Sequence, residues 1–180
     1  MGIEIEKKFT VKNLPQDLEK YPFHEIEQGY LNVSPAIRVR RQDDIYYMTY
    51  KAKLNVEGQI GQTEYNMPLD ESSYENLARK ADGIVIKKRR YLIPINEDAF
   101  DEEYIKRDEE LRTALEKGKV KIELDVFKGH YDGVILAEVE FPSEGAASNY
   151  HPASWFKEDV TKDYRYMNSQ MSKGVTFEDF

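Results

Sequence analysis

The 180 residues suit one domain or at most two small ones, and 40% hydrophobic with 33% charged residues is typical of a globular protein with more charge than average. No apolar run is long enough to span a membrane, the first residues contain no secretory signal, and the absence of cysteine excludes disulfides and thiolate chemistry. The net charge of -8 argues against a general nucleic-acid-binding surface but is compatible with a local anion site. Together, these features lead us to expect a cytoplasmic protein with no nucleic acid or membrane partner.

Strand-like segments recur in chain order, and turn residues such as Ser34-Pro35 and Asp43-Asp44 separate several of them. We expect strands at Gly2–Val11, Glu25–Val33, Ala36–Gln42, Ile45–Lys53, Ile60–Leu69, Gly83–Ile95, Lys119–Lys128 and Gly133–Phe141. Eight strands with short reversals predict an antiparallel meander, a number of strands that can close into a barrel.

Helical segments fall between these strands. Asp70 through Ala81 begins with an acidic stretch suited to an N-cap, and the charged segment Glu97 through Lys117 ends at Gly118, which suits a C-cap. Trp155 through Ser172 is predicted to form one or two further helices. The predicted class is therefore α+β, an eight-stranded antiparallel closed β-barrel with surrounding helices.

The first strand raises a question about its charged face. Glu4, Glu6 and Lys8 alternate with Ile3 and Ile5, so the charges share one face of the strand. A single strand of this kind usually turns its charges to water.

The same alternation returns along the chain, which weakens that ordinary interpretation. Charged residues at period two form the pairs Arg38/Arg40, Lys51/Lys53, Lys88/Arg90, Glu123/Asp125 and Glu138/Glu140, and Glu64 follows Gln62 on its strand. Basic and acidic residues segregate by strand, and the opposite face is apolar. If the sheet closes and helices cover its outside, the charged face points inward and the apolar face packs outward.

A buried surface with this much charge is costly unless its groups pair, bind metal or stay wet. A phosphate chain would meet the basic residues, and Mg²⁺ or Mn²⁺ would meet the carboxylates. Glu4 and Glu6 can reach one ion, with Glu140 as the preferred third ligand. A second ion could use Glu64, Glu123, Asp125 and Glu138, although spacing alone does not assign the carboxylates.

In their order along the chain, these motifs resemble the CYTH superfamily, the triphosphate tunnel metalloenzymes. The matching stretches are IEIEKKF, RVR, TYK, TEY, KRRY, IELDVFKG and LAEVEFPSE, followed by VTKDYRYMNSQMSKG, which is similar to the family's C-terminal plug. The resemblance implies one tunnel domain over residues 1–180, a plug segment at about 154–173, divalent-metal dependence and a triphosphate substrate.

The resemblance also implies roles for particular residues. The first metal would lie at Glu4, Glu6 and Glu140, and the phosphates would contact Lys8, Arg38, Arg40, Lys51, Lys88 and Arg90. On the plug, Lys162 and Arg165 would add basic contacts, with a plain surface charge as the alternative for each. Lys53 extends the same face without a firm motif match. Within the run of four basic residues on the sixth strand, a register slip would replace Lys88 and Arg90 with Lys87 and Arg89.

The favoured function is metal-dependent hydrolysis of inorganic triphosphate to pyrophosphate and phosphate. The alternatives are a nucleoside or thiamine triphosphatase, an adenylate cyclase of the kind found in this superfamily, and a non-catalytic polyphosphate-binding protein. The candidate catalytic residues are Glu4, Glu6, Lys8, Glu64, Glu123, Asp125, Glu138 and Glu140. A homodimer is a reasonable expectation for a small cytoplasmic enzyme.

Overall fold

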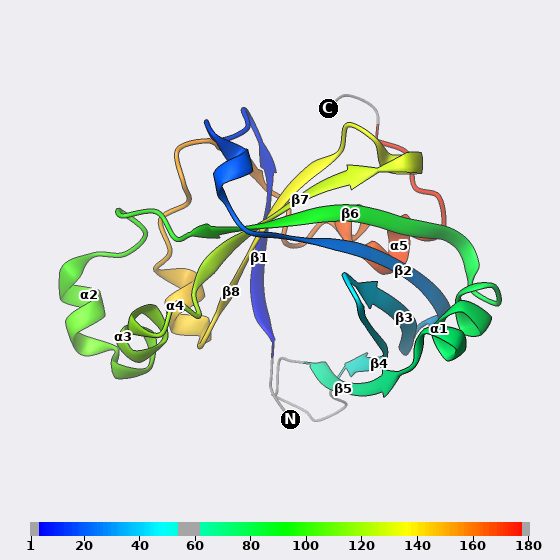
Figure 1. Cartoon of the computed structure of the whole chain (residues 1–180). Coiled ribbons are helices and arrows are strands. Elements are labelled where there is room, and N and C mark those ends of the chain that lie inside the picture. Colours follow the sequence, from blue (N-terminus) through cyan, green and yellow to red (C-terminus); the bar gives the residue numbers. More distant parts are fainter. Residues whose placement is uncertain (1–3, 54–61, 178–180) are drawn as a thin grey trace.

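The computed structural model describes residues 4–53 and 62–177, with only the backbone of Lys53 and Gln62. Nine strands form one antiparallel sheet in the order β5-β4-β3-β2-β6-β7-β8-β1-β9 (Figure 1). The strands are β1 (Ile5–Val11), β2 (Phe23–Val33), β3 (Ala36–Gln42), β4 (Ile45–Lys53), β5 (Gln62–Leu69), β6 (Asp82–Pro94), β7 (Lys121–Lys128), β8 (Ile135–Phe141) and β9 (Phe156–Asp159). The predicted α+β class and antiparallel arrangement are confirmed, and the structure adds a ninth strand.

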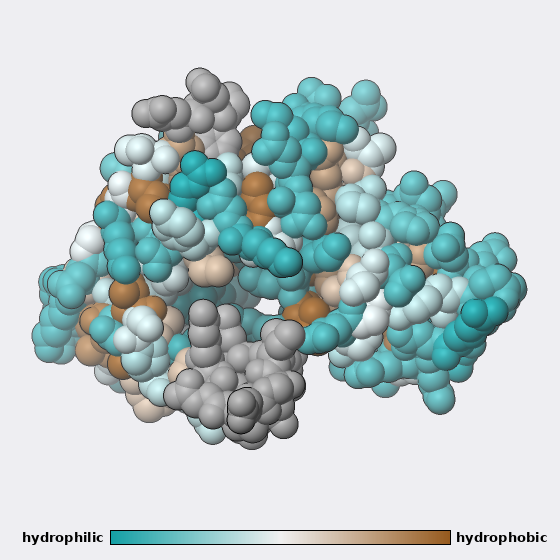
Figure 2. Space-filling model, turned by 180° about the vertical axis from the view of Figure 1, so that it is seen from behind, coloured by the Kyte–Doolittle hydropathy of each residue, from teal (hydrophilic) through white to brown (hydrophobic). Residues whose placement is uncertain are grey.

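The sheet curls so that strands far apart in its order approach each other. Five strands separate β4 from β1, yet Lys51 of β4 contacts Glu4, the residue that precedes β1. Within the described ranges this contact is made by side chains, because backbone pairing joins β1 only to β8 and β9. Figure 2 shows an opening near the middle of the molecule with hydrophilic surface around part of its rim.

The apolar face of the sheet points outward and forms the main core, as the alternation predicts. Helices α2 (Glu102–Arg107), α3 (Glu109–Glu116) and α4 (Glu144–Ser148) lie on this side (Figure 1). Buried side chains of the strands and helices meet there, namely Phe9, Ile122, Leu124, Ala137, Val139, Phe141, Leu111, Ala114, Ala146 and Ala147. Full burial of each large apolar side chain contributes roughly 1.5–3 kcal/mol, so this layer stabilises the sheet from outside and leaves its other face free for polar groups.

The structure confirms the start of one predicted helix and divides another into two. Helix α1 (Glu71–Ala78) begins as predicted, because the Asp70 carboxylate accepts a hydrogen bond of 2.7 Å from the Ser73 amide. The single helix expected over Glu97 through Lys117 is wrong, because the chain leaves helical geometry at Asp108. The Asp108 carboxylate instead accepts from the Leu111 amide at 2.9 Å and starts α3.

The C-terminal segment also differs from the prediction. Its first part is β9 rather than a helix, since Val11 and Phe9 of β1 pair with it. A 3₁₀ turn, η3 (Tyr164–Tyr166), and the short α5 (Asn168–Met171) follow. Two further 3₁₀ turns are η1 (Leu18–Lys20) and η2 (Gly129–Tyr131).

Helix α5 lies inside the curve of the sheet (Figure 1). Met171 of α5 is fully buried in a second, smaller apolar cluster, which also contains Ile86, Phe127, Tyr131, Val134 and Leu136. Ile86, Phe127 and Leu136 lie on the same strand faces as the charged residues. The inner surface of the sheet is therefore apolar at the end that α5 covers and charged beyond it.

In the part of the chain that the structure describes, no helix has the length and apolar character needed to cross a membrane.

Candidate active site

The register of β6 determines which of its basic residues face the interior. Lys88 is completely buried and contacts Asp125, and Arg90 contacts the same carboxylate. Lys87 lies on the outer face, where its half-exposed side chain is 3.1 Å from Glu27. The structure therefore selects the register with Lys88 and Arg90 inside.

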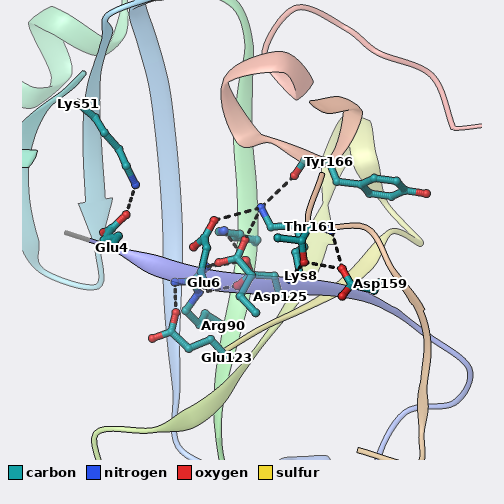
Figure 3. Close-up of polar contacts among 12 residues, drawn as sticks. Glu4, Glu6, Lys8, Lys51, Arg90, Glu123, Asp125, Asp159, Thr161 and Tyr166 are labelled. Carbon is teal, nitrogen blue, oxygen red and sulfur yellow. Dashed lines mark hydrogen bonds and ion pairs between the residues drawn. The ribbon is translucent and has the colours of Figure 1, made fainter. Parts of the chain in front are cut away.

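Three cations and three carboxylates form a connected group on the inner face, which we call the neutral ion cluster (Figure 3). Its members are Lys8, Lys88, Arg90, Glu123, Asp125 and Glu138. Arg90 stands at its centre, with Nε 2.6 Å from Asp125 and Nη2 2.6 Å from Glu138. Lys8 Nζ lies 2.9 Å from Glu138. Because positive and negative charges are equal in number, this cluster has no charge left over.

In this cluster, neighbouring opposite charges keep the buried groups ionised. Burial works against the ionised carboxylate of Glu138, but Lys8, Arg90 and Lys88 hold its pKa well below the usual value. Burial likewise opposes the charge of Arg90, but Asp125, Glu138 and Glu123 hold its pKa well above the usual value. Lys88 differs, because burial and the neighbouring Arg90 lower its pKa to about 8.

Two arginines on β3 face the interior without such compensation. Within the described ranges, neither Arg38 nor Arg40 forms an ion pair. Arg40 donates from Nε to Gln28 Oε1 at 2.8 Å and from Nη1 to the Tyr47 hydroxyl at 3.1 Å, and both partners are neutral. Burial and the charge of Arg38 lower the pKa of Arg40. No described ion pair therefore cancels the positive charge of these two arginines, although the charge of Arg38 contributes to lowering the pKa of Glu64.

Lys51 of β4 lies between two carboxylates, in contact with Glu4 and 3.6 Å from Glu64. The position of Glu64 is fixed by Asn66, which donates to it at 2.9 Å and accepts from Thr49 at 2.7 Å. Burial raises the pKa of Glu4. Burial also opposes the charge of Glu64, but hydrogen bonds from Glu4 and Asn66, together with the charges of Lys51 and Arg38, lower the pKa of Glu64. The two acids therefore differ in their tendency to hold a proton.

Glu6 and Glu140 carry the uncompensated negative charge. They face each other across β1 and β8, and burial followed by repulsion from neighbouring carboxylates raises the pKa of both. Lys8 is 4.0 Å from Glu6 but already lies closer to Glu138. The Glu6 side chain is 45% exposed, so water reaches it although protein surrounds it.

Glu6 and Glu140 have the chemical character of ligands for a hard divalent cation. Such ions prefer carboxylate oxygens and keep several waters, and a cation would relieve the repulsion between Glu6 and Glu140. In the described ranges no three acidic or histidine side chains are already gathered closely enough to hold an ion. Glu4 is the nearest candidate for a third ligand by sequence, and here it contacts Lys51.

The carboxylates predicted to bind a second ion already contact cations, unlike Glu140 within the described ranges. Glu123, Asp125 and Glu138 all contact Arg90 in the neutral ion cluster, and Glu64 lies near Lys51. The role of these four residues at a second ion stays a prediction.

The plug residues do not join the neutral ion cluster. Arg165 is half-exposed and pairs with Asp163 at 2.6 Å, and Lys162 is exposed. The plug contacts this cluster through its backbone instead, since Lys8 Nζ donates to the Tyr166 carbonyl at 3.1 Å (Figure 3). The phosphate-binding roles of Lys162 and Arg165 stay predictions, and the side chain of Lys53 lies outside the described part of the chain.

Sequence reasoning did not single out two polar residues of the inner face: Gln28 and Tyr47. Each is uncharged, so the search for charge at period two passes over it. Gln28 carries a weak signal, because it shares one strand face with Ile26 and Tyr30, and an amide buried among apolar side chains needs a hydrogen-bond partner.

Comparisons with known proteins agree with this geometry. Residues 2–174 match the model of the CYTH domain family. The chain is 34% identical over 176 residues to an inorganic triphosphatase of Nitrosomonas europaea, covering 96% of this chain and 98% of that protein. It is 30% identical to an inorganic triphosphatase of Acetivibrio thermocellus, covering 96% and 95%. A crystal structure of an inorganic triphosphatase superimposes with a TM-score of 0.66 at 30% identity, covering 97% of each chain.

Proposed function

This chain belongs to the CYTH domain family, and on that premise we propose that it is a metal-dependent hydrolase of inorganic triphosphate, which it cleaves to pyrophosphate and orthophosphate. One observation carries the proposal. The inner face holds an arginine pair, Arg38 and Arg40, without carboxylate partners in the described ranges, and a carboxylate pair, Glu6 and Glu140, with repelling charges. A metal-bound phosphate chain compensates both pairs at once.

The arginines bind and orient the substrate in this proposal. A guanidinium presents several N–H donors to phosphate oxygens, and two of them in a partly buried site neutralise charge more strongly than they would in water. Lys51 adds a further cation beside Glu4 and Glu64. Substrate binding at Lys51 would therefore compete with its contact to Glu4.

The neutral ion cluster supplies rigidity rather than free charge. Arg90 is fixed by three carboxylates, so its position does not depend on the substrate. A rigid frame of this kind keeps the neighbouring charged groups in place, so that they need little reorganisation during phosphoryl transfer. A divalent cation, Mg²⁺ or Mn²⁺, bound by Glu4, Glu6 and Glu140 would supply Lewis-acid stabilisation of that charge.

We also propose that residues 1–180 act as one triphosphate tunnel domain and that the protein works in the cytoplasm on a small-molecule substrate. A homodimer is the proposed assembly.

The experiment is a comparison of substrates. Phosphate release from tripolyphosphate, ATP and thiamine triphosphate is measured with Mg²⁺, Mn²⁺ or EDTA, for the wild type and for Glu6→Ala. The proposal expects fast, metal-dependent cleavage of tripolyphosphate that the variant loses. Preference for ATP or thiamine triphosphate would change the substrate, and cyclic AMP formed from ATP would indicate a cyclase. If no substrate reacts but tripolyphosphate binds, the protein is a polyphosphate-binding module.

A further inference from the structure

Gln28 is a completely buried polar residue in the interior beside the arginine pair. It lies on β2 directly opposite Arg40 of β3, on the strand face that carries the inner arginines. Its Oε1 accepts the 2.8 Å hydrogen bond from Arg40 Nε. A buried amide in this position fixes the plane of the guanidinium, because Nε is the donor nearest the stem of the arginine side chain.

The neutrality of this acceptor distinguishes Arg40 from Arg90. Arg90 is fixed by carboxylates, which cancel its charge. Gln28 and the Tyr47 hydroxyl fix Arg40 without cancelling its charge. A glutamate at position 28 would have nearly the same shape and would form a charge-assisted pair, so a role limited to stability would be served better by glutamate.

The other end of the Gln28 amide differs from its hydrogen-bonded oxygen. Its Nε2 is buried and has no hydrogen-bond partner among the described residues. An amide donor left without an acceptor in the interior is unfavourable by about 1–3 kcal/mol. An anionic oxygen bound by Arg40 would provide an acceptor beside the same amide.

We propose that Gln28 is a positioning and specificity residue for phosphate, which fixes Arg40 with its carbonyl oxygen, keeps the guanidinium charge available, and donates its amide to the phosphoryl group that Arg40 binds. The inference rests on the proposed triphosphate substrate and adds a neutral residue to its binding surface.

Two substitutions separate this role from a structural one. Gln28→Glu keeps the shape and the acceptor, but it neutralises Arg40 and turns the donor into an acceptor. Gln28→Met keeps the volume and removes both hydrogen bonds. Gln16→Glu, an exposed loop substitution, controls for the change in net charge. Binding of tripolyphosphate is measured by calorimetry in EDTA, and thermal unfolding of each variant is measured in the same buffer.

We expect Gln28→Glu to weaken tripolyphosphate binding by roughly tenfold to a hundredfold, as the loss of hydrogen bonds to a charged group predicts. The melting temperature of this variant should stay equal to or above that of the wild type, because the new carboxylate pairs with Arg40. Gln28→Met should weaken binding less than Gln28→Glu and lower the melting temperature. Gln16→Glu should bind as the wild type does.

A double-mutant cycle with Arg40→Met completes the test. If Gln28 acts through Arg40, Gln28→Glu loses most of its effect in the Arg40→Met background. The inference is overturned if Gln28→Glu binds tripolyphosphate within about twofold of the wild type, or if its effect is equally large in both backgrounds. If Gln28→Glu does not fold, Gln28→Met enters the same cycle with the same criterion. Because binding is measured in EDTA, a wild type that binds but does not hydrolyse would refute the proposed function and leave this inference standing.

Discussion

Glu138 and Glu140 lie two residues apart on β8 and face the same side of the sheet, but their surroundings are opposite. Glu138 is buried between Lys8 and Arg90, and its pKa is depressed by these cations against the effect of burial. The Glu140 side chain remains accessible to solvent, but desolvation by the surrounding protein and repulsion from Glu123 and Glu6 raise its pKa. The first carboxylate is therefore expected to stabilise the fold and the second to serve a ligand.

This difference predicts different results for the same substitution. Glu138→Gln should lower the free energy of unfolding by about 3 kcal/mol, because it leaves buried cations without their partner. Glu140→Gln should leave that free energy unchanged or slightly higher in EDTA, while metal-dependent hydrolysis is lost. Urea denaturation of both variants in EDTA, together with the hydrolysis assay, makes the comparison. Equal destabilisation by the two substitutions would contradict the assignment.

At the scale of elements, an ion network on the outer face joins three strands. Glu25 of β2 accepts from Arg89 of β6 at 2.6 Å and from Lys128 of β7 at 2.8 Å. Burial alone would raise the pKa of Glu25, but the hydrogen bonds from Lys128 and Arg89 lower it. A depressed carboxyl pKa contributes stability above the unfolded-state pKa of about 4.3, and this contribution is lost as the pH falls through the folded-state value.

Glu25→Gln should therefore destabilise the protein at pH 7 and have little effect at acidic pH. The side chain is 41% exposed, so solvent screening limits the expected loss to about 0.5–1 kcal/mol at pH 7. Urea denaturation of the wild type and the variant from pH 7 downward measures the difference, with Glu19→Gln on the exposed η1 turn as the charge control. A difference that grows as the pH falls would have the wrong sign for this account.

The attachment of α5 depends on a glycine at the start of β6. Gly83 has a φ of 73°, and a Cβ at this position would meet the Ser172 carbonyl oxygen, which accepts from the Ile84 amide at 2.7 Å. Gly129 has a similar φ of 67°, and a Cβ there would meet no neighbour. Gly83 is therefore needed both for its conformation and for the close approach of the plug.

Gly83→Ala should lower the free energy of unfolding by at least about 2 kcal/mol and expose the C-terminal segment. Gly129→Ala should lower this free energy by only about 1 kcal/mol, because only the left-handed backbone conformation opposes alanine there. Limited proteolysis and thermal unfolding of both variants measure these effects. Equal protection of the C-terminal segment in the two variants would show that Gly83 does not control the attachment of α5.

The elements that the sequence predicts well are those in which local pattern and tertiary packing agree. Period-two alternation identifies the inner residues of β3, β7 and β8, because β7 and β8 pack their apolar side into the main core beneath the helices, and β3 contacts α1. Strand β9 was missed because four residues with one apolar side chain form a strand only through pairing with β1. The break at Asp108 was missed because a single acidic residue inside a charged helical segment resembles its neighbours until its side chain caps the next helix.

The candidate site divides in the same way. Residue types and alternation place Glu6, Glu140, Arg38 and Arg40 on one face, but alternation does not say which charge pairs with which. Pairing depends on register between strands, and this register neutralises Arg90 while leaving Arg40 with neutral partners. The sequence therefore predicts a charged interior, and only the structure separates its neutral cluster from its uncompensated groups.

For the whole molecule, the net charge of -8 is compatible with the proposed anion site, because cations such as Lys8, Arg40 and Lys88 are buried within the curled sheet. The account predicts that the phosphate chain lies between the arginine pair and the Glu6–Glu140 pair, with the cation at the carboxylates. A net negative surface and an internal positive region are compatible, since local surroundings determine the potential inside a cleft.

The most direct test is a crystal structure with Mn²⁺ and a non-hydrolysable imido analogue of triphosphate, in which anomalous scattering locates the metal. We expect an anomalous peak at Glu6 and Glu140 and phosphoryl oxygens within hydrogen-bond distance of Arg38 and Arg40. A peak away from both glutamates, or an analogue bound without contact to either arginine, would contradict it.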